Sequence, residues 1–303
     1  MTKEEFLSSL KRKKGYKRCV ASPLRYAGGK SLAVGIIAEN LPPGIKKIVS
    51  PFFGGGSIEI ACAKYLGTDI VGYDIFDFLV NYWNYQINKP KELHKILAKL
   101  KPNKKEYAKV KEILKSAWLK EKSLPDIKKA AYYYFNHNLS YGPGFLGWMS
   151  SIYENEERYQ KLLERVKTFN TEGKMKVSQA DFKNVIPKHK KDFLYCDPPY
   201  YLEGDSKMFR GIYPQRNFPV HHNNFDHKLL ADLLKKHKGG FILSYNDCKA
   251  VRDIYKGFRI IDVSWQYTMG QGETRIGLNR KNENRGYVKK SHEILILGEK
   301  KNA

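Results

Sequence analysis

A cluster of polar and aromatic residues follows an apolar stretch in the second half of the chain. Residues 193–196 predict a buried strand, and Asp197, Pro198, Pro199 and Tyr200 come directly after it. Pro198 disfavours helical geometry at Asp197, and neither proline can donate a backbone hydrogen bond, so the turn is stiff. The Asp197 carboxylate and a proline carbonyl then form two acceptors for the two N–H groups of an exocyclic amine. An amine held in this way can attack an electrophilic methyl group.

The same cluster has two further implications. Tyr200 can stack on a base that has been swung out of a duplex. At the carboxyl end of a parallel strand, the cluster would also lie in the usual ligand crevice of an α/β sheet. The structural alternative is a rigid turn that ends a core strand.

A glycine-rich segment at 50–57 lies between an expected strand at 45–49 and an expected helix at 57–66. Glycines such as Gly54 and Gly56 let backbone N–H groups approach a ligand at a helix N-terminus. Asp74 ends the next expected strand, 20 residues after Gly54, which is the spacing of an acid that binds ribose hydroxyls. The pattern therefore predicts a nucleoside-containing cofactor. It lacks both the G-x-G-x-x-G fingerprint and the lysine of an ATP-binding loop.

A second glycine turn, Gly28-Gly29-Lys30-Ser31, opens an expected helix over 31–40. It is not a phosphate-binding loop, because the earlier glycine is missing and no strand precedes it. Lys30 could face a carboxylate or a DNA phosphate, and the spacing alone favours a surface lysine.

The periodicity predicts α/β architecture. Two strand–helix units over 45–83 indicate a parallel sheet, and further strands are expected at 175–177, 193–196, 241–244, 258–263 and 294–297. The last two can pair antiparallel. Lysine-rich helical stretches separate the two strand-forming regions. We therefore expect one sheet assembled from residues 1–85 and 174–303, with a basic helical insertion at 86–173.

These motifs together resemble the Dam-type, D12 class of DNA N6-adenine methyltransferases. The resemblance rests on residues 26–30, 51–57, Asp74 with Asp77, 197–200, 243–247, and Glu293 before the last strand, all in the family's order. It implies a Rossmann-like methyltransferase sheet and S-adenosylmethionine as cofactor. It also implies direct methyl transfer without a metal, and an insertion that recognises the target in double-stranded DNA.

The resemblance assigns roles to individual positions. Asp197 bridges cofactor and target amine, within a catalytic turn of Asp197, Pro198, Pro199 and Tyr200. The expected cofactor-binding residues are Tyr26, Ala27, Gly28, Lys30, Phe52, Gly54, Gly56, Ser57, Asp74 and Asp197. One departure concerns Ser50, which stands where the family usually has an acidic residue. A long segment at 202–224 is another and could hold extra DNA contacts.

DNA contacts are expected in two segments. One is a loop within the insertion, with Asn136, Asn138, Tyr141 and Phe145, where a turn joining two helices is the alternative. The other is a basic stretch with Arg275, Arg280, Lys281 and Arg285. A net charge of +24 favours a polyanionic partner and binding driven by counterion release.

The remaining composition excludes several classes of protein. The four cysteines form no CxxC pair, His221 and His222 lack a third ligand, and no apolar run is long enough to span a bilayer. We therefore expect a cytoplasmic protein with neither a metal site nor a membrane anchor. A restriction endonuclease acting on the same site is a possible counterpart. The residues alone leave open the methylation of cytosine N4, RNA or a protein amide, and an inactive DNA-binding protein.

Overall fold

The computed structural model describes residues 1–13, 15–142, 144–201, 225–263 and 293–300. Within them the strands are β1 (Lys47–Ser50), β2 (Asp69–Asp74), β3 (Met175–Gln179), β4 (Leu194–Cys196), β5 (Phe241–Asn246), β6 (Arg259–Val263) and β7 (Glu293–Gly298). The helices before β3 are α1 (Lys3–Leu10), α2 (Val34–Glu39), α3 (Ser57–Leu66), α4 (Asp77–Asn88), α5 (Pro90–Leu97), α6 (Lys104–Trp118), α7 (Asp126–Leu139), the short η1 (Ser151–Tyr153) and α8 (Glu156–Lys167). After β3 come α9 (Phe182–Lys188), α11 (His227–Lys236) and α12 (Lys249–Ile254).

The described strands form one sheet in the order β3-β2-β1-β4-β5-β7-β6. Strands β3, β2, β1, β4 and β5 run parallel to one another, and β7 pairs antiparallel with both β5 and β6. The chain leaves β1 toward β3 and returns to β4 on the other side of β1. The strand order therefore reverses between β1 and β4, which is where open α/β sheets bind ligands.

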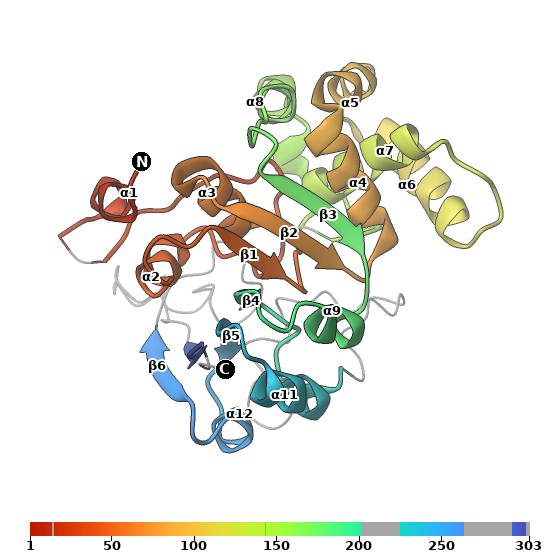
Figure 1. Cartoon of the computed structure of the whole chain (residues 1–303). Helices are drawn as coiled ribbons and strands as arrows, with labels where there is room; N and C mark the ends of the chain where they lie inside the picture. Colours follow the sequence, from red (N-terminus) through yellow and green to blue (C-terminus); the bar gives the residue numbers. More distant parts are fainter. Residues whose placement is uncertain (14, 143, 202–224, 264–292, 301–303) are drawn as a thin grey trace, which may run out of the picture.

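Both faces of the sheet are covered by helices (Figure 1). Neighbouring strand residues point to opposite faces, so Ile48 and Ile70 join the core under α3 and α4, while Val49 and Val71 join the core under α9 and α11. This double burial explains the continuous apolar runs in the strands. The Rossmann-like α/β sheet expected from the sequence is confirmed.

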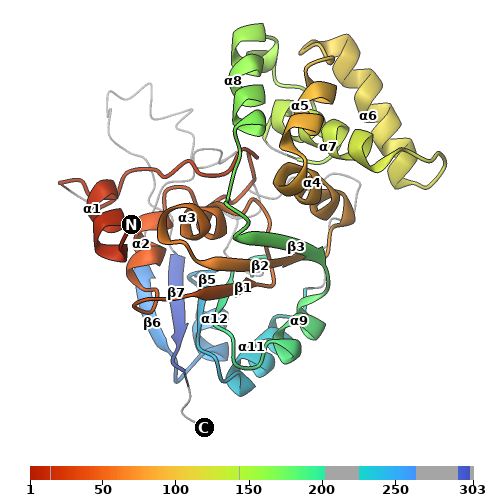
Figure 2. The same cartoon turned by 45° about the horizontal axis from the view of Figure 1, so that its top comes forward.

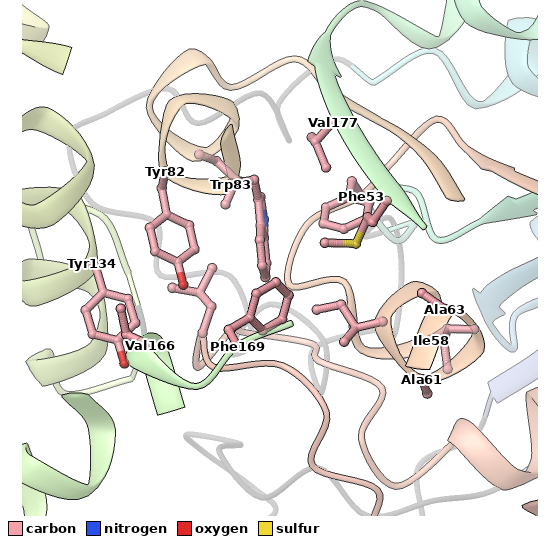
Figure 3. Packing of buried hydrophobic residues seen from close by; sticks show 14 of the residues in the cluster. Phe53, Ile58, Ala61, Ala63, Tyr82, Trp83, Tyr134, Val166, Phe169 and Val177 are labelled. Carbon is pink, nitrogen blue, oxygen red and sulfur yellow. The ribbon is translucent and has the colours of Figure 1, made fainter. Parts of the chain in front are cut away.

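The helices α5 to α8 lie beyond α4, at one end of the molecule (Figure 2). They share a hydrophobic core with the helices next to the sheet. Figure 3 shows this continuity, with Tyr134 of α7 and Val166 of α8 near Tyr82 and Trp83 of α4, and Phe53 beyond Trp83. The ring of Trp83 meets Phe53 edge-on at 5.2 Å between centroids, and Tyr82 stacks on Tyr134 at 5.5 Å. The division into a catalytic part and an insertion stays a prediction.

Most expected elements form close to their expected bounds, including the antiparallel pairing of β6 with β7. The helix expected over 31–40 is shorter, because residues 31–33 form turns and α2 begins at Val34. The Ser31 carbonyl instead accepts the backbone N–H of Cys19 at 2.8 Å. Gly67 ends α3 with φ = 65°, a left-handed conformation that glycine adopts at little cost.

Candidate active site

A cavity of about 310 Å³ opens at the carboxyl ends of β1, β2 and β4. Its size falls within the usual range of ligand pockets, which begins at about 300 Å³. Each expected catalytic and cofactor-binding residue contributes to the lining: Tyr26, Ala27, Gly28, Lys30, Phe52, Gly54, Gly56, Ser57, Asp74, Asp197, Pro198, Pro199 and Tyr200. The cavity therefore lies at the reversal of strand order and gathers residues from distant parts of the chain.

Asp197 and Lys30 form an ion pair inside this cavity. The Lys30 ammonium lies 2.8 Å from each carboxylate oxygen of Asp197 and also donates to the Gly28 carbonyl at 3.1 Å. Lys30 is 4% exposed, so the prediction of a surface lysine, which the spacing favoured, is wrong. The Asp197 side chain is 24% exposed, because it opens onto the cavity. Burial raises the pKa of Asp197, and the Lys30 ammonium limits this rise.

The aromatic ring of Tyr200 is held from three directions. Its hydroxyl donates a hydrogen bond to the Glu293 carboxylate of β7, and its ring stacks on Tyr245 of β5 at 6.0 Å between centroids. The Lys30 ammonium lies 4.9 Å from its centroid. Strands β5 and β7 therefore set the position of a residue that follows β4.

The next residue is held in a similar way. Asn246 exchanges two hydrogen bonds of 2.9 Å with the backbone N–H and carbonyl of Tyr201. Together with the contacts of Tyr200, these bonds make the turn after β4 rigid in the folded protein.

The glycine turn before α3 packs against Tyr26. A Cβ atom at Gly55 would lie 2.5 Å from the Cβ of Tyr26, so a larger residue there would displace that ring. Asp74 stabilises the same turn, since its carboxylate accepts the backbone N–H of Gly54 at 2.9 Å and that of Phe76 at 3.0 Å. The acid at the end of β2 and the glycine turn are thus parts of one arrangement.

A second buried carboxylate belongs to Glu59, in the first turn of α3. It lines the cavity, is 2% exposed, and accepts a hydrogen bond of 2.6 Å from the hydroxyl of Ser50 at the end of β1. Burial raises the pKa of Glu59 to about 7, and the nearby Asp197 carboxylate adds to the rise. Hydrogen bonds from Ser50 and from the N-terminal backbone of α3 oppose it.

Three phenylalanines line another part of the cavity. Phe52, Phe182 and Phe225 contact one another, with ring centroids 5.1 to 5.7 Å apart. Aromatic walls of this kind accept flat, apolar rings. Phe182 and Phe225 were not expected from the sequence, because Phe182 begins α9 and Phe225 lies just before α11, both outside the conspicuous motifs.

The arrangement of an acid, a glycine turn and a stiff Asp-Pro-Pro-Tyr turn around one cavity agrees with a comparison to protein families. Residues 26–269 match the D12 class N6 adenine-specific DNA methyltransferase family, over most of the chain. The chain belongs to this family. The protein is therefore an adenine-specific DNA methyltransferase, and its substrate is DNA.

No helix among the described residues of this methyltransferase is both long enough and apolar enough to cross a lipid bilayer. Across the same residues, no cluster of three or more His, Cys, Asp or Glu side chains could hold a metal ion.

The residues expected to contact DNA differ in their exposure to solvent. Tyr141 is 49% exposed, whereas Asn136 and Asn138 are fully buried. Asn138 accepts the backbone N–H of Arg25 at 2.7 Å, and Asn136 accepts that of Leu146 at 2.8 Å. Both amides lie in the last turn of α7, where Asn136 holds the following loop and Asn138 holds the segment before α2. Their burial contradicts their expected role as direct DNA contacts.

Phe145 is half-buried among Phe76, Phe78, Trp118 and Tyr133, so its ring is part of the packing of the methyltransferase. The expected contacts at Arg275, Arg280, Lys281 and Arg285 lie outside the described residues, as do His221, His222 and the segment 202–224.

Trp148, which was not expected from the sequence, also lies on the surface of the loop after α7. Trp148 is 66% exposed, and the Lys111 ammonium of α6 lies 4.6 Å from its ring centroid. The backbone N–H of Tyr141 donates to the Trp148 carbonyl at 2.6 Å, which brings the two aromatic residues together at the end of the loop. An aromatic residue next to a glycine, in a loop already expected to contact DNA, was the available signal.

Proposed function

We propose that this methyltransferase uses S-adenosylmethionine to methylate N6 of an adenine that has been swung out of double-stranded DNA. The observation that supports it best is the position of Asp197, at the end of β4 and open to a cavity that also contains Asp74 and the glycine turn. S-adenosylmethionine, when bound, supplies a methyl group on a positively charged sulfur.

The cavity lining fits this cofactor. The acid at the end of β2 suits the ribose hydroxyls, and the glycine turn allows the close backbone approach that a nucleoside needs. Among the described residues, the lining contains two cations and five carboxylates, an excess of acidic groups that suits a cationic donor: Lys30 and Lys183 against Glu59, Asp74, Asp181, Asp197 and Asp226. Phe52, Phe182 and Phe225 offer a flat apolar wall for one of the two adenine rings.

The turn after β4 prepares the amine. The Asp197 carboxylate and the Pro198 carbonyl accept its two hydrogens, which draws the nitrogen lone pair out of conjugation with the ring. Asp197 is then also a suitable acceptor for the proton that the methylated nitrogen must lose, since burial has raised its pKa. The contacts of Tyr200 with Glu293 and Tyr245 keep the aromatic side of this site in place.

The helices α5 to α8 and the loop that follows α7 are proposed as the part that recognises the target DNA. This part borders the cavity at two points: the Tyr26 ring stacks at 5.6 Å on His137, in the last turn of α7, and Phe76 packs at 5.1 Å on Phe145 of the loop. Trp148 and Tyr141 extend from it into solvent next to lysine-rich α6. Base unstacking is assisted when an exposed aromatic ring can enter the base stack.

Methylation-sensitive sequencing tests the proposal. DNA from cells that produce the protein should carry N6-methyladenine at one short sequence, and Asp197→Ala should strongly reduce the modification. Modification of single-stranded DNA alone would contradict the duplex substrate. A restriction endonuclease with the same target sequence is a further part of the proposal, and a genome cut at unmethylated copies of that sequence would support it.

A further inference from the structure

The inner end of the cavity contains more carboxylates than cations. Lys30 contacts both oxygens of Asp197, so the positive charge at this end is already paired. Glu59 lies close enough to Asp197 for the two carboxylates to repel each other. A second cationic group entering here would therefore be attracted to the carboxylate of Glu59.

The surroundings hold the Glu59 side chain in one place. The Ser50 hydroxyl binds one of its oxygens at 2.6 Å, and the backbone at the N-terminus of α3 donates to the same carboxylate. Ser50 is fully buried at the end of β1, next to β4 in the sheet, so this pair lies beside the strand that carries Asp197. A carboxylate held by several donors inside a ligand cavity is already oriented to receive a charged group.

We propose that Glu59, held by Ser50, binds the α-ammonium group of the methyl donor. This assignment rests on the proposed use of S-adenosylmethionine, whose two cationic groups are the sulfonium and the α-ammonium. The sulfonium must face the amine held by Asp197, and the ammonium is carried a short aliphatic chain away from it. A carboxylate beside Asp197, on the neighbouring helix, is placed to meet the second cation while the first is at the reacting centre. Ser50 stands where the family usually has an acidic residue. Glu59 would therefore supply from α3 the negative charge that is missing at position 50.

Two stable ligands separate this role from a purely structural one. The first is S-adenosylhomocysteine, and the second is its analogue with hydrogen in place of the α-amino group. Binding of both to the full-length protein is measured by calorimetry. Glu59→Gln keeps the shape and the hydrogen bond from Ser50 but removes the charge. We expect it to weaken S-adenosylhomocysteine binding about ten- to a hundredfold and to leave binding of the analogue within about threefold.

Ser50→Ala is the matched control, since it keeps the Glu59 carboxylate and removes only the hydrogen bond that the Ser50 hydroxyl donates to it. It should reduce binding of S-adenosylhomocysteine by less than Glu59→Gln does. An equal loss of both ligands in Glu59→Gln, or no loss of either, would overturn the assignment of Glu59. If the wild-type protein bound neither ligand, the proposed cofactor would be wrong as well, so the two failures are distinguishable.

A measurement on the wild-type protein is independent of any variant. An ammonium that pairs with Glu59 lowers the pKa of that carboxyl from about 7, so S-adenosylhomocysteine should release protons on binding at pH 7. The other titratable residues of the lining are Tyr26, Lys30, Asp74, Asp181, Lys183, Tyr195, Asp197, Tyr200 and Asp226. Under the proposal only Glu59 pairs with the ammonium, so these other groups should respond to both ligands alike. Proton release is obtained from calorimetry in buffers with different ionisation enthalpies. Equal release with the two ligands would contradict the proposal.

Discussion

The ammonium of Lys30 lies 2.8 Å from both carboxylate oxygens of Asp197, although 167 residues separate the two in the chain. The pair joins the turn before α2 to the turn after β4 at the centre of the active-site cavity. Burial favours the neutral form of Asp197, and Lys30 favours the charged form. The balance between these two effects sets the charge on the residue that we propose to hold the amine.

Replacing Lys30 should therefore move the pH dependence of methylation. In Lys30→Met nothing opposes the effect of burial, so the pKa of Asp197 rises further and the acidic limb of the rate profile shifts to higher pH. Lys30→Arg keeps a positive charge and is the control. The measurement is the single-turnover rate against pH, and an unshifted acidic limb in Lys30→Met would contradict the account.

The same variant should lower stability. Removing one partner of a buried ion pair typically costs about 3–5 kcal/mol, and we expect the lower end because Asp197 can take up a proton at the cavity. Chemical denaturation at pH 8 and at pH 5.5 tests this, since the cost should be smaller at the lower pH, where Asp197 is more readily protonated. A larger loss of stability in Lys30→Met at pH 5.5 than at pH 8 would contradict this account of the ion pair.

The third prediction concerns Tyr200 and its hydrogen bond to Glu293. Tyr200→Phe keeps the ring that stacks on Tyr245 but leaves the buried Glu293 carboxylate without the tyrosine hydroxyl, at a cost of about 1–3 kcal/mol. Tyr200→Ala removes the ring as well, so methylation should fall much further than in Tyr200→Phe. Denaturation and steady-state kinetics measure the two effects, and equal activity losses would show that the ring has no separate role.

Trp148 should contribute to DNA binding and little to folding. Because 66% of its side chain is exposed, Trp148→Ala should change stability by no more than about 0.5 kcal/mol. Stacking on one base is worth about 1–3 kcal/mol, so duplex affinity should fall roughly five- to a hundredfold. Leu119→Ala, at a residue 46% exposed after α6, is the matched control. Equal affinities for the two variants would exclude Trp148 from the interface.

Salt dependence tests the electrostatic part of DNA binding. Each phosphate contact contributes about one to the slope of log K against log[salt]. We expect a steep slope for the wild-type protein, and Lys105→Gln, on the exposed face of α6, should reduce it by about one. Affinity that is independent of salt would contradict the polyanion-binding role of the positive charge.

The sequence predicted the sheet and the cavity well for a physical reason. Strands buried on both faces are continuous apolar runs, and ligand-binding turns follow their carboxyl ends, so Asp74 and Asp197 could be located from neighbouring residues alone. The same local reasoning failed for Lys30. Its burial depends on a partner 167 residues away, and nothing in its own turn reveals that partner.

Similar limits explain Asn136 and Asn138. Polar residues in a glycine-containing loop suggest contact with a ligand, yet these amides are used to bind the backbone of Leu146 and Arg25. Glu59 was passed over for the opposite reason. Its position in the first turn of a helix is typical of an exposed residue, and only the fold shows that Ser50 and the cavity enclose it.

The most direct test of the account follows the methyl group to its acceptor. Purified protein is incubated with labelled S-adenosylmethionine and unmethylated duplex DNA, and the nucleosides are separated. We predict that the label appears in N6-methyladenine, and that Asp197→Ala loses about a hundred- to a thousandfold in rate while it still binds S-adenosylhomocysteine. Label in another nucleoside, or undiminished activity in Asp197→Ala, would contradict the central role of the turn after β4.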